Sequence, residues 1–235
     1  MTKFYIDKDK VGEFWRNHSS KFQLDDRLGL SNLETDEELG KLKLKEEQIV
    51  INKYFSDLSG CMLDLGAGSG EWSIFLAKQF NKVISVEKTD GMIEVFNKRL
   101  ERLGPNNIEL IQSDVTNLRI QDNIDIVFMS GLCIYLNDLD LEDLLKNLLS
   151  RNKGKLEIIV RDGTGITKRH FIDGEYSEAL DASYYALYRT RDEYIELFHK
   201  YGFYLEKDQD MFEEGSSLNK WKETRLRIYK FIIEE

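Results

Sequence analysis

The sequence predicts an α/β protein built on a mostly parallel sheet, and two observations support this. From residue 61 onward, short runs rich in Val and Ile alternate with amphipathic helical segments, a pattern typical of a parallel sheet with helices on both faces. The chain has 235 residues, of which 41% are hydrophobic and 32% charged, so it is long enough for one such domain with additions. We therefore expect one main core.

The first five strands are expected as short apolar runs bounded by polar residues or glycine. They cover residues 61–66, 82–87, 108–114, 124–131 and 155–162. The intervening segments 91–103 and 139–150 have helical spacing of Met, Ile, Phe and Leu. A helix that ends at Gly202 and a strand follow, and residues 225–234 form a final strand. Because no helix separates these last two strands, they must pair antiparallel.

The first part of the chain has a different pattern. Residues 1–59 carry helical spacing of apolar residues without the alternation of strands. We expect them to form an N-terminal helical extension or lid, and residues 60–235 to form the main domain.

Composition excludes several classes of function. A net charge of −10 disfavours a nucleic-acid partner, because such binding needs clustered Lys and Arg. No apolar run reaches the ~18 residues of a membrane span, and the start of the chain, MTKFYIDKDK, has no apolar signal region. Histidines and cysteines form no cluster with metal-ligand spacing. We expect a cytoplasmic monomer or homodimer without a metal.

A glycine-rich turn follows the first strand in the stretch MLDLGAGSGEW. Gly66, Gly68 and Gly70 fall where a doubly wound sheet binds its ligand, although a packing role alone would also explain them. The turn is one residue shorter than the dinucleotide pattern G-x-G-x-x-G, and Asp64 lies inside the strand before it. These two features count against a nicotinamide-dependent oxidoreductase, which is kept as an alternative.

Two further acids end the next two strands. Glu87 ends the second strand, where a carboxylate can accept hydrogen bonds from ribose hydroxyls. Asp114 ends the third strand and is suited to receive an exocyclic amine. Together with Asp64, these acids predict an adenosine pocket that also favours positive charge.

In order and spacing, the segments LDLGAGSGEW, VISVEKTDGM, IQSDVTNL, DIVFMSGLCIYL and HKYGF…RIYKFIIE are similar to the class I S-adenosylmethionine-dependent methyltransferases, over about residues 60–235. The resemblance implies a Rossmann-like, seven-stranded doubly wound sheet of order 3-2-1-4-5-7-6 with the last strand antiparallel. It also implies S-adenosylmethionine as cofactor, contacted by Asp64, Gly66, Ala67, Gly68, Gly70, Glu87, Lys88, Met92, Asp114, Val115 and Ser130.

The acceptor is expected to be a small anionic molecule. The stretch after the fourth strand, SGLCIY, lacks the proline-aromatic motif of nucleic-acid amino-methylating relatives and the Asp of metal-dependent ones. Residues 151–171 hold six basic and two acidic residues, a local reversal of sign. We expect Arg161, Arg169 and Arg189 to hold the anionic group, the alternative being a solvated basic loop.

Three residues are candidates for catalysis. His170 is the preferred base by its chemistry, Asp162 competes by its position, and Tyr135 could face the reacting groups. Tyr5 and Trp15 are expected to contact the substrate. Other aromatic residues that could wall the pocket are Tyr184 and Tyr185, whereas His18 is expected at the surface unless the N-terminal helices close over the site.

A looser resemblance links residues 161–194 and 218–229 to bacterial methyltransferases associated with surface polysaccharides, which implies a phosphorylated, phosphoramidate or sugar-derived acceptor. A cofactor-binding partner subunit without catalysis is a further alternative to an enzyme.

Overall fold

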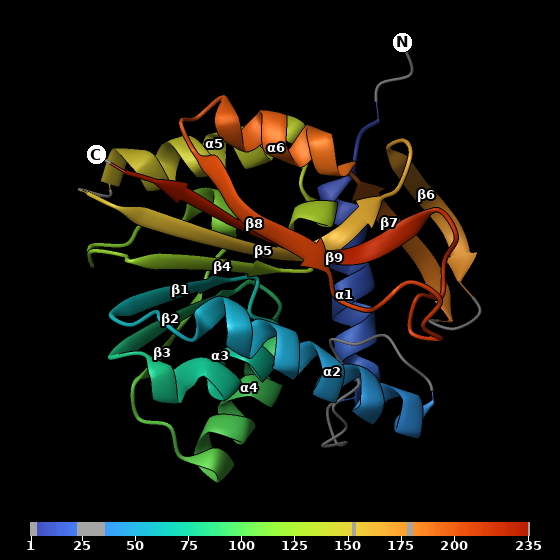
Figure 1. Ribbon diagram of the computed structural model, residues 1–235. Helices are drawn as coiled ribbons and strands as arrows, with labels where there is room; N and C mark the ends of the chain where they lie inside the picture. Colours follow the sequence, from blue (N-terminus) through green and yellow to red (C-terminus); the bar gives the residue numbers. More distant parts are fainter. Residues whose placement is uncertain (1–3, 23–35, 152–153, 178–180, 235) are drawn as a thin grey trace.

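The structure is a computed structural model that describes residues 4–22, 36–151, 154–177 and 181–234. It contains a sheet of seven strands (Figure 1). These are β1 (Cys61–Leu65), β2 (Lys82–Glu87), β3 (Ile108–Gln112), β4 (Ile126–Ser130), β5 (Leu156–Gly165), β8 (Tyr204–Asp210) and β9 (Thr224–Ile233).

The strand order is β3-β2-β1-β4-β5-β9-β8. Strands β1 to β5 are parallel to their neighbours, and β9 is antiparallel to both β5 and β8. The predicted order is confirmed, because two additional strands lie outside this sheet and only change the numbering. The carboxyl ends of the parallel strands meet at one edge, where a ligand site is expected.

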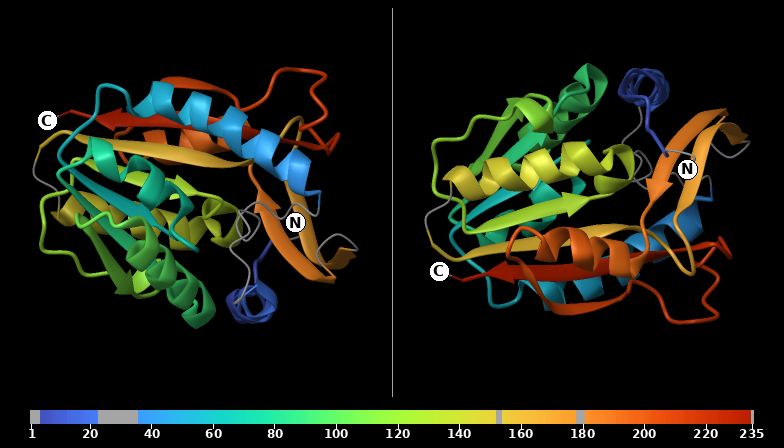
Figure 2. Two further views of the ribbon diagram at one scale, coloured as in Figure 1. Left: turned by 90° about the horizontal axis from the view of Figure 1, so that it is seen from below. Right: turned by 90° about the horizontal axis from the view of Figure 1, so that it is seen from above.

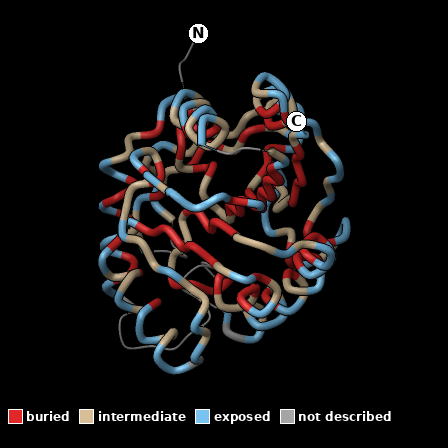
Figure 3. The backbone as a smooth tube through the Cα atoms, turned by 90° about the vertical axis from the view of Figure 1, so that its left-hand side faces the viewer, coloured by how far each residue is buried: buried red, intermediate tan, exposed pale blue. Residues whose placement is uncertain are grey.

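Helices cover both faces of the sheet (Figure 1). On one face lie α2 (Glu37–Phe55), α3 (Glu71–Leu76) and α4 (Asp90–Leu103), and on the other lie α5 (Asp138–Arg151) and α6 (Arg191–His199). Short 3-10 turns, η1 (Ala77–Gln79), η2 (Val115–Asn117) and η3 (Cys133–Tyr135), complete the connections. The central strands β1, β2, β4 and β5 are almost wholly buried between these layers (Figure 3), which explains their nearly continuous apolar sequence.

The two additional strands form a hairpin that the sequence pattern did not reveal. Strands β6 (His170–Ser177) and β7 (Ala182–Tyr188) pair antiparallel as a separate two-stranded sheet. The fifth strand was expected to end at residue 162, but β5 continues to Gly165 and the hairpin begins soon after it. Charged residues and a bulge near Gly174 obscure the alternation in β6.

Helix α1 (Lys8–Phe22) lies beside the hairpin (Figure 2) and contacts both β7 and α4. The backbone of Ile6, just before the helix, exchanges two hydrogen bonds with the side chain of Asn137. A Cβ on Gly91 would meet the Oγ atom of Ser19 at 2.4 Å, so α1 packs closely on the start of α4. No helix among the described residues is long and apolar enough to span a membrane.

Candidate active site

A cavity of about 970 Å³ opens at the carboxyl ends of the parallel strands, a size within the range of small-molecule sites. Its walls come from the glycine turn, the ends of β2 to β5, α1, α2, the hairpin and the segment before β9. The structure brings together most of the predicted site residues here: Trp15, Asp64, Gly66, Ala67, Gly68, Glu87, Lys88, Met92, Asp114, Val115, Ser130, Tyr135, Arg161, Asp162 and His170.

The glycines of the first turn have different surroundings. Gly66, Gly68 and Gly70 all have positive φ angles, of 71°, 55° and 80°, which disfavour a side chain. A Cβ on Gly70 would meet the ring of Phe96 at 2.2 Å, whereas one on Gly68 would meet nothing within 4 Å. Gly70 is therefore required by packing and does not line the cavity, while Gly68 leaves open space there.

Glu87 closes the turn from the end of β2. Its Oε2 atom accepts the backbone N–H of Gly68 at 3.0 Å, and its Oε1 atom accepts those of Lys88 and Thr89 at 2.9 and 2.8 Å. These bonds fix the buried carboxylate of Glu87 at the cavity wall. A carboxylate oxygen has further lone pairs, so Glu87 can also accept hydrogen bonds from a diol.

Asp64 is buried in β1 at the base of the same turn. Burial raises its pKa to about 7, and the hydrogen bond from the Ser73 hydroxyl only partly opposes this rise. Ser73 in turn accepts a hydrogen bond from Ser85 at 2.8 Å. The site therefore holds a carboxyl group that would gain from a nearby positive charge.

Asp114 follows β3 and caps η2. Its Oδ1 atom accepts both the backbone N–H and the hydroxyl of Thr116, at 2.9 and 2.7 Å, and the ammonium of Lys88 lies 3.5 Å from Oδ2. Burial opposes ionisation of Asp114, but these bonds and the Lys88 charge outweigh it and lower the pKa. Asp114 thus presents an ionised carboxylate beside Met92 and Val115 in the wall.

Asp162, near the end of β5, has no exposed surface. Burial raises its pKa to about 6, and the hydrogen bonds from Gly163 and Ile134 and the charge of Arg189 oppose this rise. The Gly163 and Ile134 N–H groups donate at 2.9 and 3.1 Å. This carboxyl group lines the cavity on the side of η3 and the hairpin.

Three tyrosines surround this part of the cavity. The phenol oxygens of Tyr135 and Tyr184 lie 3.0 Å apart, and Tyr188 lines the cavity with them. Burial raises the pKa of all three, so they stay protonated. Tyr188 was missed in the sequence, although its alternation with Tyr184 and Ala186 in β7 places the three on one face of the strand.

The three arginines expected to hold an anionic group do not all lie in the cavity. Arg161 lines the cavity but pairs with the buried Glu47 of α2. Arg169 pairs with Asp138 and Glu193 and does not line the cavity. Two of the six basic residues counted over residues 151–171 are thus paired with carboxylates from elsewhere in the chain.

Arg189 is also outside the cavity lining, because its guanidinium is wholly buried. It donates to the carbonyls of Cys133 and Leu136, both at 2.7 Å, and pairs with Asp138 at 2.8 Å. These contacts hold the η3 turn that carries Tyr135.

Of the histidines and N-terminal aromatic residues considered in the sequence, some line the cavity and others do not. His170 lines the cavity with its ring 5.7 Å from that of Tyr188. Tyr5 is 59% exposed and does not line the cavity. His18 is buried and stacks on Phe14, so the expectation of a surface position was wrong. Tyr185 also lies outside the lining.

Comparison with known proteins agrees with this geometry. Residues 62–153 match the sequence profile of a family described as "Methyltransferase domain". This matched region contains the glycine turn and the acids Asp64, Glu87 and Asp114. Residues 62–153 therefore carry the sequence of a methyltransferase domain.

Curated proteins are similar in sequence to most of this chain. Phosphoethanolamine N-methyltransferase 1 from Triticum aestivum is 30% identical over 180 residues, which are 74% of this chain and 35% of the wheat protein. Phosphoethanolamine N-methyltransferase 3 from Arabidopsis thaliana is 26% identical over 76% of this chain and 36% of its own length. The chain spans about a third of the length of these curated relatives.

Solved structures share the fold. Phosphoethanolamine N-methyltransferase 1 from Haemonchus contortus, in complex with phosphoethanolamine and S-adenosylhomocysteine, has a TM-score of 0.72 at 19% identity, covering 97% of this chain and 49% of that one. The complex of DhpI with S-adenosylhomocysteine has a TM-score of 0.65 at 14% identity and covers 97% of this chain and 96% of that one.

S-adenosylmethionine is the cofactor of this family, and the residues present fit it. The space beside Gly68 admits a ligand close to the backbone. Glu87 and Asp114 supply carboxylates at the ends of adjacent strands, and Met92 adds an apolar side chain to the cavity lining. The cavity then continues past Ser130 to Asp162, which leaves room for an acceptor beside the cofactor.

Proposed function

We propose that this protein transfers a methyl group from S-adenosylmethionine to the amine nitrogen of a small acceptor that also carries an anionic group, with phosphoethanolamine as the candidate acceptor. The observation that carries the proposal is the wholly buried carboxyl group of Asp162 among Tyr135, Tyr184 and Tyr188 in the cavity wall. A buried carboxylate is stabilised by a cation, and aromatic rings also favour a cationic nitrogen. An amine therefore fits this part of the cavity better than an alcohol.

The chain's own groups would align the acceptor and shield it. Bound S-adenosylmethionine supplies an electrophilic methyl group for an in-line displacement. Asp162 would accept a hydrogen bond from the acceptor nitrogen and orient its lone pair, and such alignment is a major source of rate. His170, in the same wall, would accept the proton that the amine must lose. The hairpin and α1 would exclude water.

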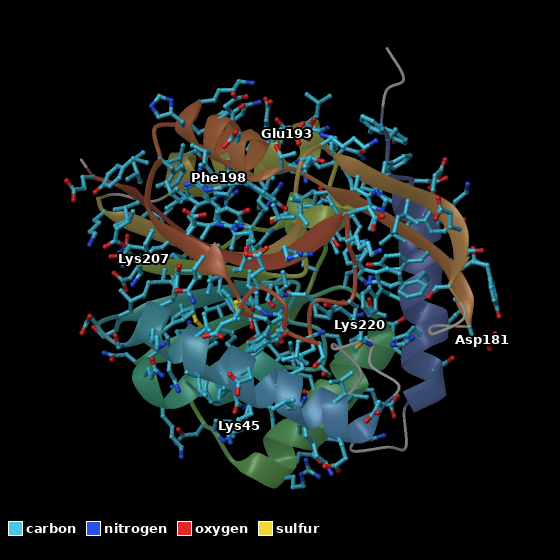
Figure 4. All side chains as sticks on the ribbon, turned by 45° about the vertical axis from the view of Figure 1, so that its right-hand side comes forward. Lys45, Asp181, Glu193, Phe198, Lys207 and Lys220 are labelled. Carbon is cyan, nitrogen blue, oxygen red and sulfur yellow. The ribbon has the colours of Figure 1, made fainter. Side chains whose placement is uncertain are left out.

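The anionic group would bind toward the segment before β9. Lys220 and Arg225 line the cavity there, and Figure 4 shows Lys220 on the same side of the molecule as α1 and the hairpin. The Nη1 atom of Arg225 donates to the carbonyls of Trp221 and Thr224, and among the described residues it has no carboxylate partner. Its charge is therefore available for a phosphate.

The curated relatives named above, which are phosphoethanolamine N-methyltransferases, support the nitrogen as the methylated atom. A phosphorylated or phosphoramidate-bearing sugar derivative is the second candidate acceptor, and it rests on the looser sequence resemblance alone. It would also place anionic oxygens near Arg225, so the acceptor has to be tested directly. A partner subunit without catalysis predicts cofactor binding and no transfer.

The test is methyl transfer from S-adenosylmethionine labelled with ¹³C in its methyl group, followed by NMR of the products. Phosphoethanolamine, ethanolamine and phosphocholine are compared, since ethanolamine lacks the phosphate and phosphocholine lacks a free amine. We expect an N-methyl signal with phosphoethanolamine, a weaker one with ethanolamine and none with phosphocholine. Cofactor binding without transfer to phosphoethanolamine, or an O-methyl product, would overturn the proposal.

A further inference from the structure

Arg161 and Asp162 are adjacent in β5 but face opposite sides of the sheet, as successive residues of a strand must. Asp162 faces η3 and α6, where Ile134 and Tyr194 contact its Oδ2 atom. Arg161 faces α2 and α3, where its guanidinium lies 5.5 Å from the ring of Trp72. The two side chains therefore line different parts of the cavity. Arg161 lies on the same face of the sheet as α3, the helix that follows the glycine turn.

The guanidinium of Arg161 is held in a fixed orientation. Its Nη1 atom donates to the hydroxyl of Ser130 at 3.0 Å, and its Nη2 atom lies 2.5 Å from Oε1 of Glu47. Glu47 has no exposed surface and Arg161 is 8% exposed. The pair is thus almost removed from water, and α2 is linked through it to the ends of β4 and β5.

One of the three guanidinium nitrogens of Arg161 has no partner among the described residues. The buried Nε–H has no hydrogen-bond partner among the described residues, and such a group costs free energy unless a ligand or water satisfies it. Lys43, one turn before Glu47 on α2, also lines the cavity and adds positive charge to its wall. A guanidinium with an unused donor is suited to a carboxylate.

We infer that Arg161, held by Glu47, binds the amino-acid carboxylate of the S-adenosylmethionine methionine group, and that α2 is part of the cofactor site. This rests on the proposed function, which requires the cofactor. The proposed function puts the acceptor on the Asp162 side of β5, with its anionic group toward Arg225 and away from Arg161. Helix α2, although it precedes the sheet in sequence, then belongs to cofactor binding and not to a separate lid.

Two ligands that differ only at this end provide the test. S-adenosylhomocysteine carries the amino-acid group, and 5′-methylthioadenosine keeps the adenosine and the sulfur without it. Calorimetry measures the Kd of each for the wild-type protein, Arg161→Gln and Arg161→Lys, with Arg225→Gln as a matched cavity-lining control. We expect Arg161→Gln to raise the Kd of S-adenosylhomocysteine at least tenfold and to leave the Kd of 5′-methylthioadenosine within about twofold of the wild-type value. The Kd of S-adenosylhomocysteine for Arg161→Lys should lie between those of the wild-type protein and Arg161→Gln.

Retained binding of 5′-methylthioadenosine shows in the same experiment that each variant is folded. An equal loss for both ligands, or no loss for either, would overturn the inference. A loss with Arg225→Gln as large as that with Arg161→Gln would do the same. If the wild-type protein binds neither ligand, the proposed function itself fails, which is a separate result.

Discussion

The backbone N–H of Ile134 donates a hydrogen bond of 3.1 Å to the Oδ2 atom of Asp162. This bond ties the η3 turn, which follows β4, to the end of β5, and Arg189 holds the same turn through the carbonyls of Cys133 and Leu136. The Asp162 carboxylate is thus fixed while it lines the cavity. A fixed carboxylate needs no reorganisation when it receives an amine.

The substitution Asp162→Asn tests this role. The amide keeps the shape of the side chain but removes the charge that would orient the acceptor nitrogen. We expect the rate of methyl transfer to fall on the order of 10²-fold or more, while the Kd of S-adenosylhomocysteine stays within about twofold. Single-turnover kinetics and calorimetry measure the two effects, and a parallel loss of cofactor affinity would contradict the assignment.

The pH dependence of activity follows from the same group. Burial raises the pKa of Asp162 to about 6, and the acceptor requires its ionised form. We expect kcat/KM for the acceptor to fall about tenfold per pH unit below pH 6, as Asp162 becomes protonated. Asp162→Asn should abolish this acid limb. If the limb persists in the variant, another group, with His170 the first candidate, controls it.

The stability of the protein should depend on the buried Asp64. Its pKa in the folded state, about 7, lies above the value near 3.9 of an unfolded chain. The folded state therefore binds more protons between these values, and the contribution of Asp64 to stability is lost as the pH rises from about 4 through 7. Urea unfolding should show Asp64→Asn gaining stability relative to wild type over this range. A difference in the free energy of unfolding between the two proteins that does not change with pH would contradict the raised pKa.

Gly68 and Gly70 offer a matched pair of substitutions in one turn. Gly70→Ala places a Cβ against Phe96 at a positive φ, so we expect it to destabilise the fold by about 2–4 kcal/mol. Gly68→Ala meets open space and should cost only about 1 kcal/mol of backbone strain, yet reduce cofactor affinity. Thermal unfolding and calorimetry distinguish the two, and an unchanged cofactor affinity of Gly68→Ala would argue against a ligand beside Gly68.

The sequence was informative for the strands and the cofactor side of the site, because both depend on short local patterns. Asp64 lies in the first predicted strand, and the glycine turn, Glu87 and Asp114 lie at the ends of predicted strands, which a parallel sheet brings to one edge. The cavity lining agrees with this placement. The roles of individual residues in binding remain predictions until a ligand is measured.

The acceptor side could not be predicted in the same way, because its contacts join residues far apart in sequence. Counting charges over residues 151–171 gave an excess of cations, but Glu47, Asp138 and Glu193 pair with Arg161 and Arg169. The hairpin of β6 and β7 was hidden because charged residues interrupt its alternation. Only the packing of α1 and η3 against the hairpin shows which faces are buried.

A crystal structure with S-adenosylhomocysteine and phosphoethanolamine tests the central claim most directly. The account predicts that the acceptor nitrogen lies within hydrogen-bond distance of the Asp162 carboxylate and faces the sulfur, with the phosphate toward Arg225. A nitrogen bound away from Asp162, or an acceptor held on the Trp72 side of β5, would contradict it.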